Sequence, residues 1–127
     1  MNKRKLNKNH NEAFLEYASF KSGRTELLKD NYANAIPFYS KAISLENEFG
    51  YKIDSYFERA LCYMCINEFE KAILDFTNVI KLVNKDSAYL DILSESFYCR
   101  GAALEEIGKK IEADADFKKS EELRGNK

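Results

Sequence analysis

Three segments of the chain share one order of small and aromatic residues. Each has a small residue, an aromatic residue at offset four and a third, mostly small residue at offset seven. These offsets lie on one stripe of an α-helix, where a small residue permits the close approach of a neighbouring helix. The pattern predicts helices over residues 31–45, 68–82 and 109–123. Their stripes consist of Ala35, Tyr39 and Ala42, then Ala72, Phe76 and Val79, then Ala113, Phe117 and Ser120.

Another helix-like run precedes each of these segments. In the second and third runs, bulky and small residues recur at offsets of 0, 4, 7 and 10, which again mark one helical face. The second run contains Tyr56, Ala60, Tyr63 and Ile66, the third contains Phe97, Gly101, Leu104 and Ile107, and the first contains Gly23. Asn67 and Gly108 tolerate left-handed backbone and predict the turns within the second and third helix pairs. Apolar residues over 89–93 predict that the third run begins early, near Ser87.

These helix pairs resemble the tetratricopeptide repeat (TPR), a helix–turn–helix unit of 34 residues. The resemblance covers about residues 16–124, with repeats at approximately 16–47, 53–86 and 94–124. It implies an all-α fold, a right-handed superhelical array (α-solenoid) of three helix pairs. The last helix is polar at Asp114 and Glu121, where its counterpart has Ile73 and Ile80. We therefore expect a self-capping final helix and a monomer.

Charge is unevenly distributed along the 127 residues. Lys3, Arg4, Lys5 and Lys8 leave 16 of the 20 basic residues to balance 21 acidic ones in the rest of the chain. We expect residues 1–10 to form a disordered basic arm that is dispensable for folding, and residues 11–127 to form a single domain whose first helix begins near Asn11. The acidic body argues against a nucleic-acid partner.

The sequence contains few residues that could form a catalytic or metal-binding site. The only histidine, His10, lies in the arm, and no acid–base pair, nucleophile–base arrangement or phosphate-binding glycine loop is evident. We therefore expect no enzymatic activity, no metal and no cofactor. Cys62 and Cys65 have C-x-x-C spacing, but both fall in the middle of a predicted helix and favour small buried residues over a redox site. The absence of a secretory signal or an 18-residue apolar stretch predicts a cytoplasmic protein with no membrane span.

Chaperone-binding members of the TPR family use a two-carboxylate clamp of Lys, Asn, Asn, Lys and Arg along their first helices. The last three clamp positions fall on Glu58, Glu95 and Cys99. The first two fall on Phe20 and Arg24 if Gly23 sets the register, or on Lys21 and Thr25 if Phe20 sets it. Because Glu58 and Glu95 would repel a peptide carboxylate, we expect no binding of chaperone C-terminal tails by this route.

The first helix of the second repeat carries a second apolar stripe, offset toward the concave side of the array. Neighbouring first helices either cover this stripe or leave it open as a peptide groove. In the second case we expect it to bind a protein or peptide partner that has apolar anchors and basic flanks. The candidate peptide-binding residues are Phe57, Glu58, Leu61, Met64, Cys65, Glu95, Tyr98, Cys99, Ala102 and Glu105.

The resemblance implies a protein–protein interaction module, either a TPR adaptor or a co-chaperone-like scaffold. The alternative is a dedicated secretion-type chaperone, which also uses three such repeats to hold an apolar client segment.

Two Arg and Asp residues recur at equal spacing. Arg59 precedes Asp75 by 16 residues, and Arg100 precedes Asp116 by the same interval. The first repeat has Ser22 and Phe38 at these places, so the pair is present or absent together. This pattern predicts two partly buried ion pairs, each within one repeat.

Overall fold

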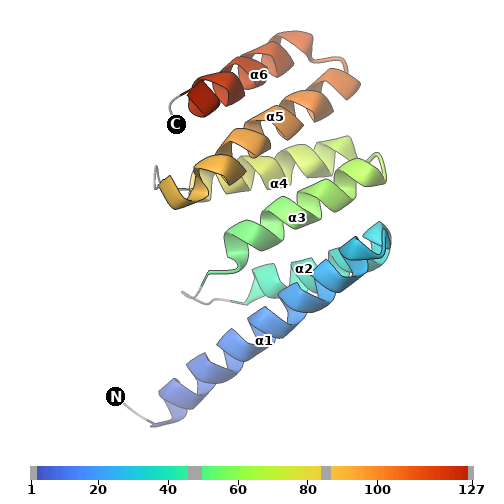
Figure 1. Ribbon diagram of the computed structural model, residues 1–127. Coiled ribbons are helices and arrows are strands. Elements are labelled where there is room, and N and C mark those ends of the chain that lie inside the picture. Colours follow the sequence, from blue (N-terminus) through green and yellow to red (C-terminus); the bar gives the residue numbers. More distant parts are fainter. Residues whose placement is uncertain (1–2, 46–49, 84–86, 126–127) are drawn as a thin grey trace.

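The computed structural model describes residues 3–45, 50–83 and 87–125, and in these ranges every regular element is helical. The elements are α1 (Lys3–Leu28), α2 (Tyr32–Ser44), α3 (Lys52–Cys65), α4 (Phe69–Leu82), a 3-10 turn η1 (Ser87–Tyr89), α5 (Leu90–Glu106) and α6 (Lys110–Gly125). Each helix packs against the next, and α3 also contacts α1 and α5. The helix pairs α1–α2, α3–α4 and α5–α6 stack along one direction (Figure 1). The predicted all-α solenoid of three helix pairs is confirmed.

In two of the repeats a glycine lies tightly against an aromatic ring. A Cβ added to Gly23 would lie 2.9 Å from Tyr39 Cε1, and one added to Gly101 would lie 2.9 Å from Phe117 Cε1. In the second repeat Ala60 occupies this place and lies in one buried cluster with Ala72 and Phe76. The stripe pattern of the sequence therefore corresponds to real close approach between first and second helices.

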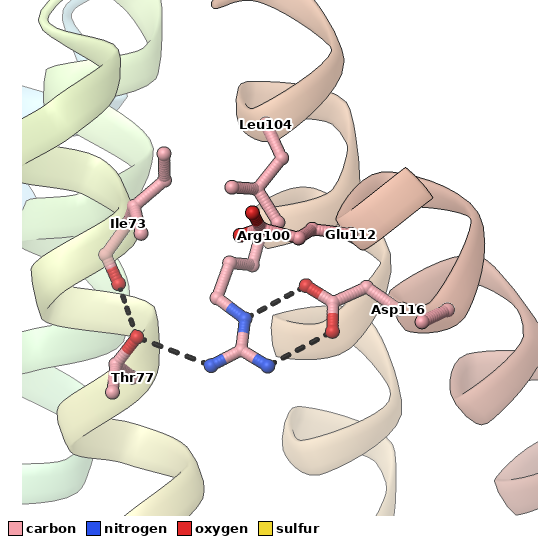
Figure 2. Close-up of a pocket in the computed structure, with 7 residues that line it drawn as sticks. Ile73, Thr77, Arg100, Leu104, Glu112 and Asp116 are labelled. Atoms are coloured by element: carbon pink, nitrogen blue, oxygen red, sulfur yellow. Dashed lines mark hydrogen bonds and ion pairs between the residues drawn. The ribbon is translucent and has the colours of Figure 1, made fainter. Parts of the chain in front are cut away.

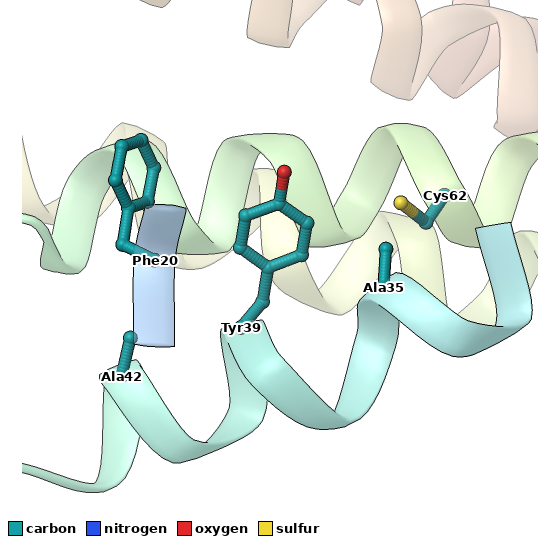
Figure 3. Packing of buried hydrophobic residues seen from close by; sticks show 5 residues of the cluster. All are labelled: Phe20, Ala35, Tyr39, Ala42 and Cys62. Atoms are coloured by element: carbon teal, nitrogen blue, oxygen red, sulfur yellow. The ribbon is translucent and has the colours of Figure 1, made fainter. Parts of the chain in front are cut away.

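The core continues from one repeat into the next. Figure 3 shows Ala35, Tyr39 and Ala42 on one side of α2, with Phe20 and Cys62 in the same cluster. Phe20 belongs to α1 and Cys62 to α3, so this single cluster joins three helices. The second helices α2 and α4 thus each lie between two first helices, whereas α6 packs against α5 alone among the described elements.

All three helix pairs turn through a residue with left-handed backbone. Asp30 and Asn67 both have φ of 61°, and Gly108 has φ of 83°. At each turn the following residue donates a backbone hydrogen bond to the carbonyl five residues earlier, as in Glu68 N to Tyr63 O at 2.8 Å. This bond satisfies a carbonyl at the end of the first helix. Asn67 and Gly108 were predicted from the sequence; Asp30 was not.

Both predicted ion pairs are present, and each is bidentate. Arg59 donates from Nε to Asp75 Oδ2 and from Nη2 to Asp75 Oδ1, both at 2.8 Å. The Arg100–Asp116 pair has the same geometry at 2.7 and 2.8 Å. The Asp75 side chain is only 4% exposed. These pairs therefore join α3 to α4 and α5 to α6 in a largely dry environment.

Each arginine also reaches back to the preceding repeat, a contact that the sequence spacing did not predict. Arg59 Nη1 donates to Ser40 Oγ on α2 at 2.9 Å, and Arg100 Nη1 donates to Thr77 Oγ1 on α4 at 3.1 Å. One guanidinium group therefore connects three helices.

A buried carboxylate of the first repeat contacts the N-terminus of α3 in the second repeat. Glu16 on α1 is 1% exposed, and its Oε1 accepts a hydrogen bond from the backbone N–H of Tyr51 at 2.7 Å. Tyr51 is the N-cap residue of α3. Glu16 thus caps the N-terminus of a neighbouring helix by accepting a hydrogen bond from an N–H group that has no partner within that helix.

The helix boundaries correct one expectation and confirm another. The expected first helix start near Asn11 is wrong, because α1 begins at Lys3. Although Asn is favoured at N-caps, Asn11 does not set the start of the helix, because no Pro or Gly interrupts the residues before it. Helical backbone in the third run begins at Ser87, as predicted, first as a 3-10 turn and from Leu90 as α5. No helix in the ranges the structure describes is long and apolar enough to cross a membrane.

We predict that Gly23→Ala destabilises the protein although alanine is the better helix former. The gain in helix propensity is about 1 kcal/mol, whereas forcing atoms into a packed core costs about 1–3 kcal/mol. The Tyr39 ring is fully buried and cannot move aside freely. Urea unfolding gives the free energy, with Gly125→Ala as a control because a Cβ there meets no atom within 4 Å. Wild-type stability or better in Gly23→Ala would contradict the tight packing.

We predict that Asp75→Ala lowers the free energy of unfolding by about 3 kcal/mol, since it leaves the Arg59 guanidinium buried without its counter-ion. Asp114→Ala on the exposed side of α6 is the matched control and should change it by less than about 0.5 kcal/mol. Equal effects of the two substitutions would show that the Arg59–Asp75 pair is not effectively buried.

Candidate functional site

The candidate residues lie on two adjacent helices that belong to one face of the solenoid. This first-helix face is formed by α1, α3 and α5, with α2 and α4 behind it in Figure 1. On it, the exposed candidates are Cys65, Glu95, Tyr98 and Glu105. The half-buried ones are Phe57, Leu61, Met64, Cys99 and Ala102. Glu58 alone is buried.

Part of the apolar stripe on α3 serves the core. Phe57, Leu61 and Met64 pack against the buried cluster of Ala60, Ala72 and Phe76. The rings of Phe57 and Phe76 meet edge to face, with centroids 5.9 Å apart. Phe57 is therefore partly covered by α4, the second helix of its own repeat. The remaining edge of Leu61 and Met64 is open toward the surface.

Glu58 is not an open charge beside the groove, and this corrects our sequence-based interpretation. Its two carboxylate oxygens accept hydrogen bonds from Arg24 Nε at 3.1 Å and Arg24 Nη2 at 2.5 Å. Its Oε1 also accepts from the Tyr39 hydroxyl at 2.9 Å. The hydrogen bond with Glu58 raises the pKa of Arg24. Burial raises the pKa of Tyr39, and the nearby Glu58 charge raises it further. Glu58 therefore serves as an interhelix link whose charge Arg24 neutralises.

The contact of Gly23 with Tyr39 settles the register of α1. Phe20 is buried between the rings of Tyr39 and Tyr51, at centroid distances of 6.1 and 4.9 Å. Arg24 lies one turn further on, half exposed. The first two clamp positions are thus Phe20 and Arg24, the alternative set by Gly23.

None of the five clamp positions then carries the residue that the two-carboxylate clamp uses. The positions are Phe20, Arg24, Glu58, Glu95 and Cys99. Of the two glutamates that were expected to repel a peptide carboxylate, Glu95 is exposed, whereas Glu58 is paired with Arg24.

Charge changes sign along the first-helix face. Lys21 and the half-exposed Arg24 lie on α1, whereas the exposed residues Glu95, Glu105 and Glu106 lie on α5. These acidic residues therefore lie on the same helix as Tyr98, whose side chain is 50% exposed.

The sequence reasoning missed Arg124, which borders this face from α6. Its Nε donates to Ser94 Oγ at 3.1 Å, and its guanidinium lies 5.6 Å from the Tyr98 ring centroid. The same ring packs against Phe117 at 5.3 Å. Tyr98 is therefore a partly exposed ring held in a fixed position. No short-range pattern signals this contact, because Arg124 and Ser94 are 30 residues apart.

The cysteines differ in environment and are all free thiols. Cys62 is buried against α2, and burial raises its pKa to about 12. Cys99 is half-buried, and burial likewise raises its pKa. Cys65 is exposed at the end of α3. In the part of the chain that the structure describes, no three His, Cys, Asp or Glu side chains gather as metal ligands.

Comparisons with known proteins agree with this geometry. Residues 17–49 match the family model of the tetratricopeptide repeat. The Arabidopsis OM64 TPR domain superposes with a TM-score of 0.75 and 22% identity, covering 91% of this chain and 88% of that one. The second TPR of Spaghetti (RPAP3), bound to the HSP90 peptide SRMEEVD, also gives a TM-score of 0.75, with 27% identity over 94% of this chain and 95% of that one. No curated protein shows a significant match to the sequence.

We predict that Ellman's reagent modifies Cys65 rapidly and Cys62 last, because the buried thiol is both inaccessible and hard to ionise at pH 8. Cys65→Ser should remove the fast phase, and Cys62→Ser only the slowest. The unfolded thiol ionises near 9, so the contribution of Cys62 to stability should fall as the pH rises from about 9 to about 12. Equal rates for Cys62 and Cys65 in the folded protein would contradict this assignment.

Proposed function

We propose that this three-repeat TPR domain is a protein-interaction module that binds a segment of a partner protein on its first-helix face. The observation that carries the proposal is that the exposed Tyr98 and the half-buried Leu61 and Met64 lie on first helices that also carry the exposed acidic residues Glu95 and Glu105. Exposed apolar side chains with a charged rim are typical of interaction sites. The peptide bound to the second TPR of Spaghetti supports the class of function.

The chemistry of the partner segment should differ from that peptide. SRMEEVD has three acidic side chains against one basic one. Glu95 and Glu105 would repel such a segment, and they favour one with Lys or Arg beside its apolar anchors. The opposite end of the face carries Lys21, which is suited to a neutral or acidic residue, whereas Glu58 already compensates the charge of Arg24. The sign change along the face would therefore also orient the bound segment.

Apolar contact and charge would contribute differently to binding. Burying one large apolar side chain supplies about 1.5–3 kcal/mol. Each exposed ion pair supplies at most about 1 kcal/mol and weakens in salt. Affinity would thus depend mainly on the anchor over Leu61, Met64 and Tyr98, whereas the glutamates would set orientation and association rate. Met64 is unbranched and flexible and can accommodate more than one shape of anchor.

The test compares two synthetic peptides with the same leucine and phenylalanine anchors, one flanked by arginine and one by glutamate. Fluorescence anisotropy at low salt should show preferential binding of the arginine-flanked peptide. Leu61→Glu should weaken binding about tenfold or more, the equivalent of at least about 1.4 kcal/mol. Glu105→Lys should weaken it roughly threefold and reduce its dependence on salt.

The control is Glu70→Lys, which makes the same charge change at an exposed position of α4. It should bind like the wild type, and circular dichroism should show that all variants are folded. If both Leu61→Glu and Glu105→Lys fold and retain full affinity, the first-helix face is not the binding site. Equal binding of the two peptides would instead favour the alternative, a chaperone that holds apolar client segments.

A further inference from the structure

A cavity of about 390 Å³ lies on the other side of the first-helix layer, between the second helices α4 and α6. Figure 2 shows its lining: Ile73 and Thr77 come from α4, Arg100 and Leu104 from α5, and Glu112 and Asp116 from α6. Arg100 crosses the cavity between Thr77 and Asp116. This volume is within the range of pockets that hold small organic groups. None of the residues assigned to the first-helix face lines it.

The equivalent groove one repeat earlier shows what is missing from this cavity. There the Arg59 guanidinium has two aromatic neighbours, Tyr56 at 5.6 Å and Tyr63 at 5.8 Å from the ring centroids. Arg100 has the counterpart of the first, Phe97 at 5.4 Å. Leu104 occupies the place of Tyr63, and among the described residues no second ring lies over Arg100. The third repeat therefore has the arginine but lacks one of the rings that accompany it.

Two further replacements change the side chains around the cavity. Leu74 on α4 has Ala115 as its counterpart on α6, which removes a second bulky side chain. Lys71 lies 5.7 Å from the Tyr63 ring, and its counterpart is the exposed residue Glu112. A cation that contacts a ring face is thus replaced by a carboxylate, which accepts hydrogen bonds.

We propose that the cavity between α4 and α6 binds a tyrosine side chain of a partner protein. The ring stacks on the Arg100 guanidinium, which has Phe97 beside it but lacks the second ring that Arg59 has. Ile73 and Leu104 provide the apolar wall for its edges. The phenol hydroxyl donates a hydrogen bond to the Glu112 carboxylate, which distinguishes tyrosine from phenylalanine. The domain then engages its partner on two sides, and this second site does not depend on the first.

The probe is p-cresol, which reproduces the tyrosine side chain, titrated into the isotopically labelled full chain and followed by NMR. Saturable shifts are expected at Thr77, Leu104 and Glu112, and toluene, which lacks the hydroxyl, should bind several-fold more weakly. Glu112→Lys should remove this difference between the two probes. Shifts centred on Tyr98, or equal binding of toluene and p-cresol to the wild type, would overturn the proposal.

Substitutions based on the second repeat provide a reciprocal test. Leu104→Tyr supplies the missing ring from within the chain and should abolish p-cresol binding; Ala115→Leu fills the cavity from α6 and should do the same if the tyrosine variant does not fold. Tyr63→Leu combined with Leu74→Ala should open the earlier groove and create a second p-cresol site, with shifts around Arg59. Unchanged p-cresol binding in the folded filled variant would overturn the assignment. So would shifts at this cavity that depend on protein concentration without probe, because they would identify a second copy of the chain as the occupant.

Discussion

The close approach of paired helices depends on a ring lying against a residue with little or no side chain. Tyr39 and Phe117 lie so near Gly23 and Gly101 that a single added carbon would reach 2.9 Å from each ring. This contact fixes the rotation of each first helix about its axis. The rotation in turn determines which side chains face the neighbouring repeat and which form the first-helix face. The contact of Gly23 with Tyr39 thus helps to set the register of α1, and with it the position of Arg24 opposite Glu58.

The fold could be predicted from the sequence because each repeat carries its packing residues at fixed, short offsets. The small–aromatic stripes, the turn residues Asn67 and Gly108 and the Arg–Asp pairs all lie within one repeat. Their spacing therefore survives in the one-dimensional pattern, and comparison between repeats makes it visible. Ser22 and Phe38 even indicated which repeat would lack the ion pair.

Contacts between repeats were not predictable in the same way. The Arg24–Glu58 pair joins residues 34 apart, and the Glu16–Tyr51 hydrogen bond spans 35. Neither contact recurs in the next repeat, so no internal comparison could reveal it. Glu58 shows the consequence for site prediction. From the sequence alone a glutamate on a first helix is expected to be an exposed charge, because the residues that pack against it are not known. The helix start at Lys3 was missed for a related reason, since a cap preference at Asn11 says nothing about the residues before it.

The two arginines that reach back across a repeat boundary make the middle helix pair the best-connected part of the chain. The α3–α4 pair is bonded to α2 through Arg59 and Ser40, and to α5 through Thr77 and Arg100. Among its described side chains the first pair has no internal ion pair of this kind, and it is joined to α3 by polar links from Glu16, Arg24, Tyr39 and Ser40. In a linear array, stability is the sum of unit and interface terms. Amide hydrogen exchange should therefore begin at the two ends of the solenoid and reach the α3–α4 pair last, so that partial opening exposes α1 and α2 while the middle of the domain keeps its structure.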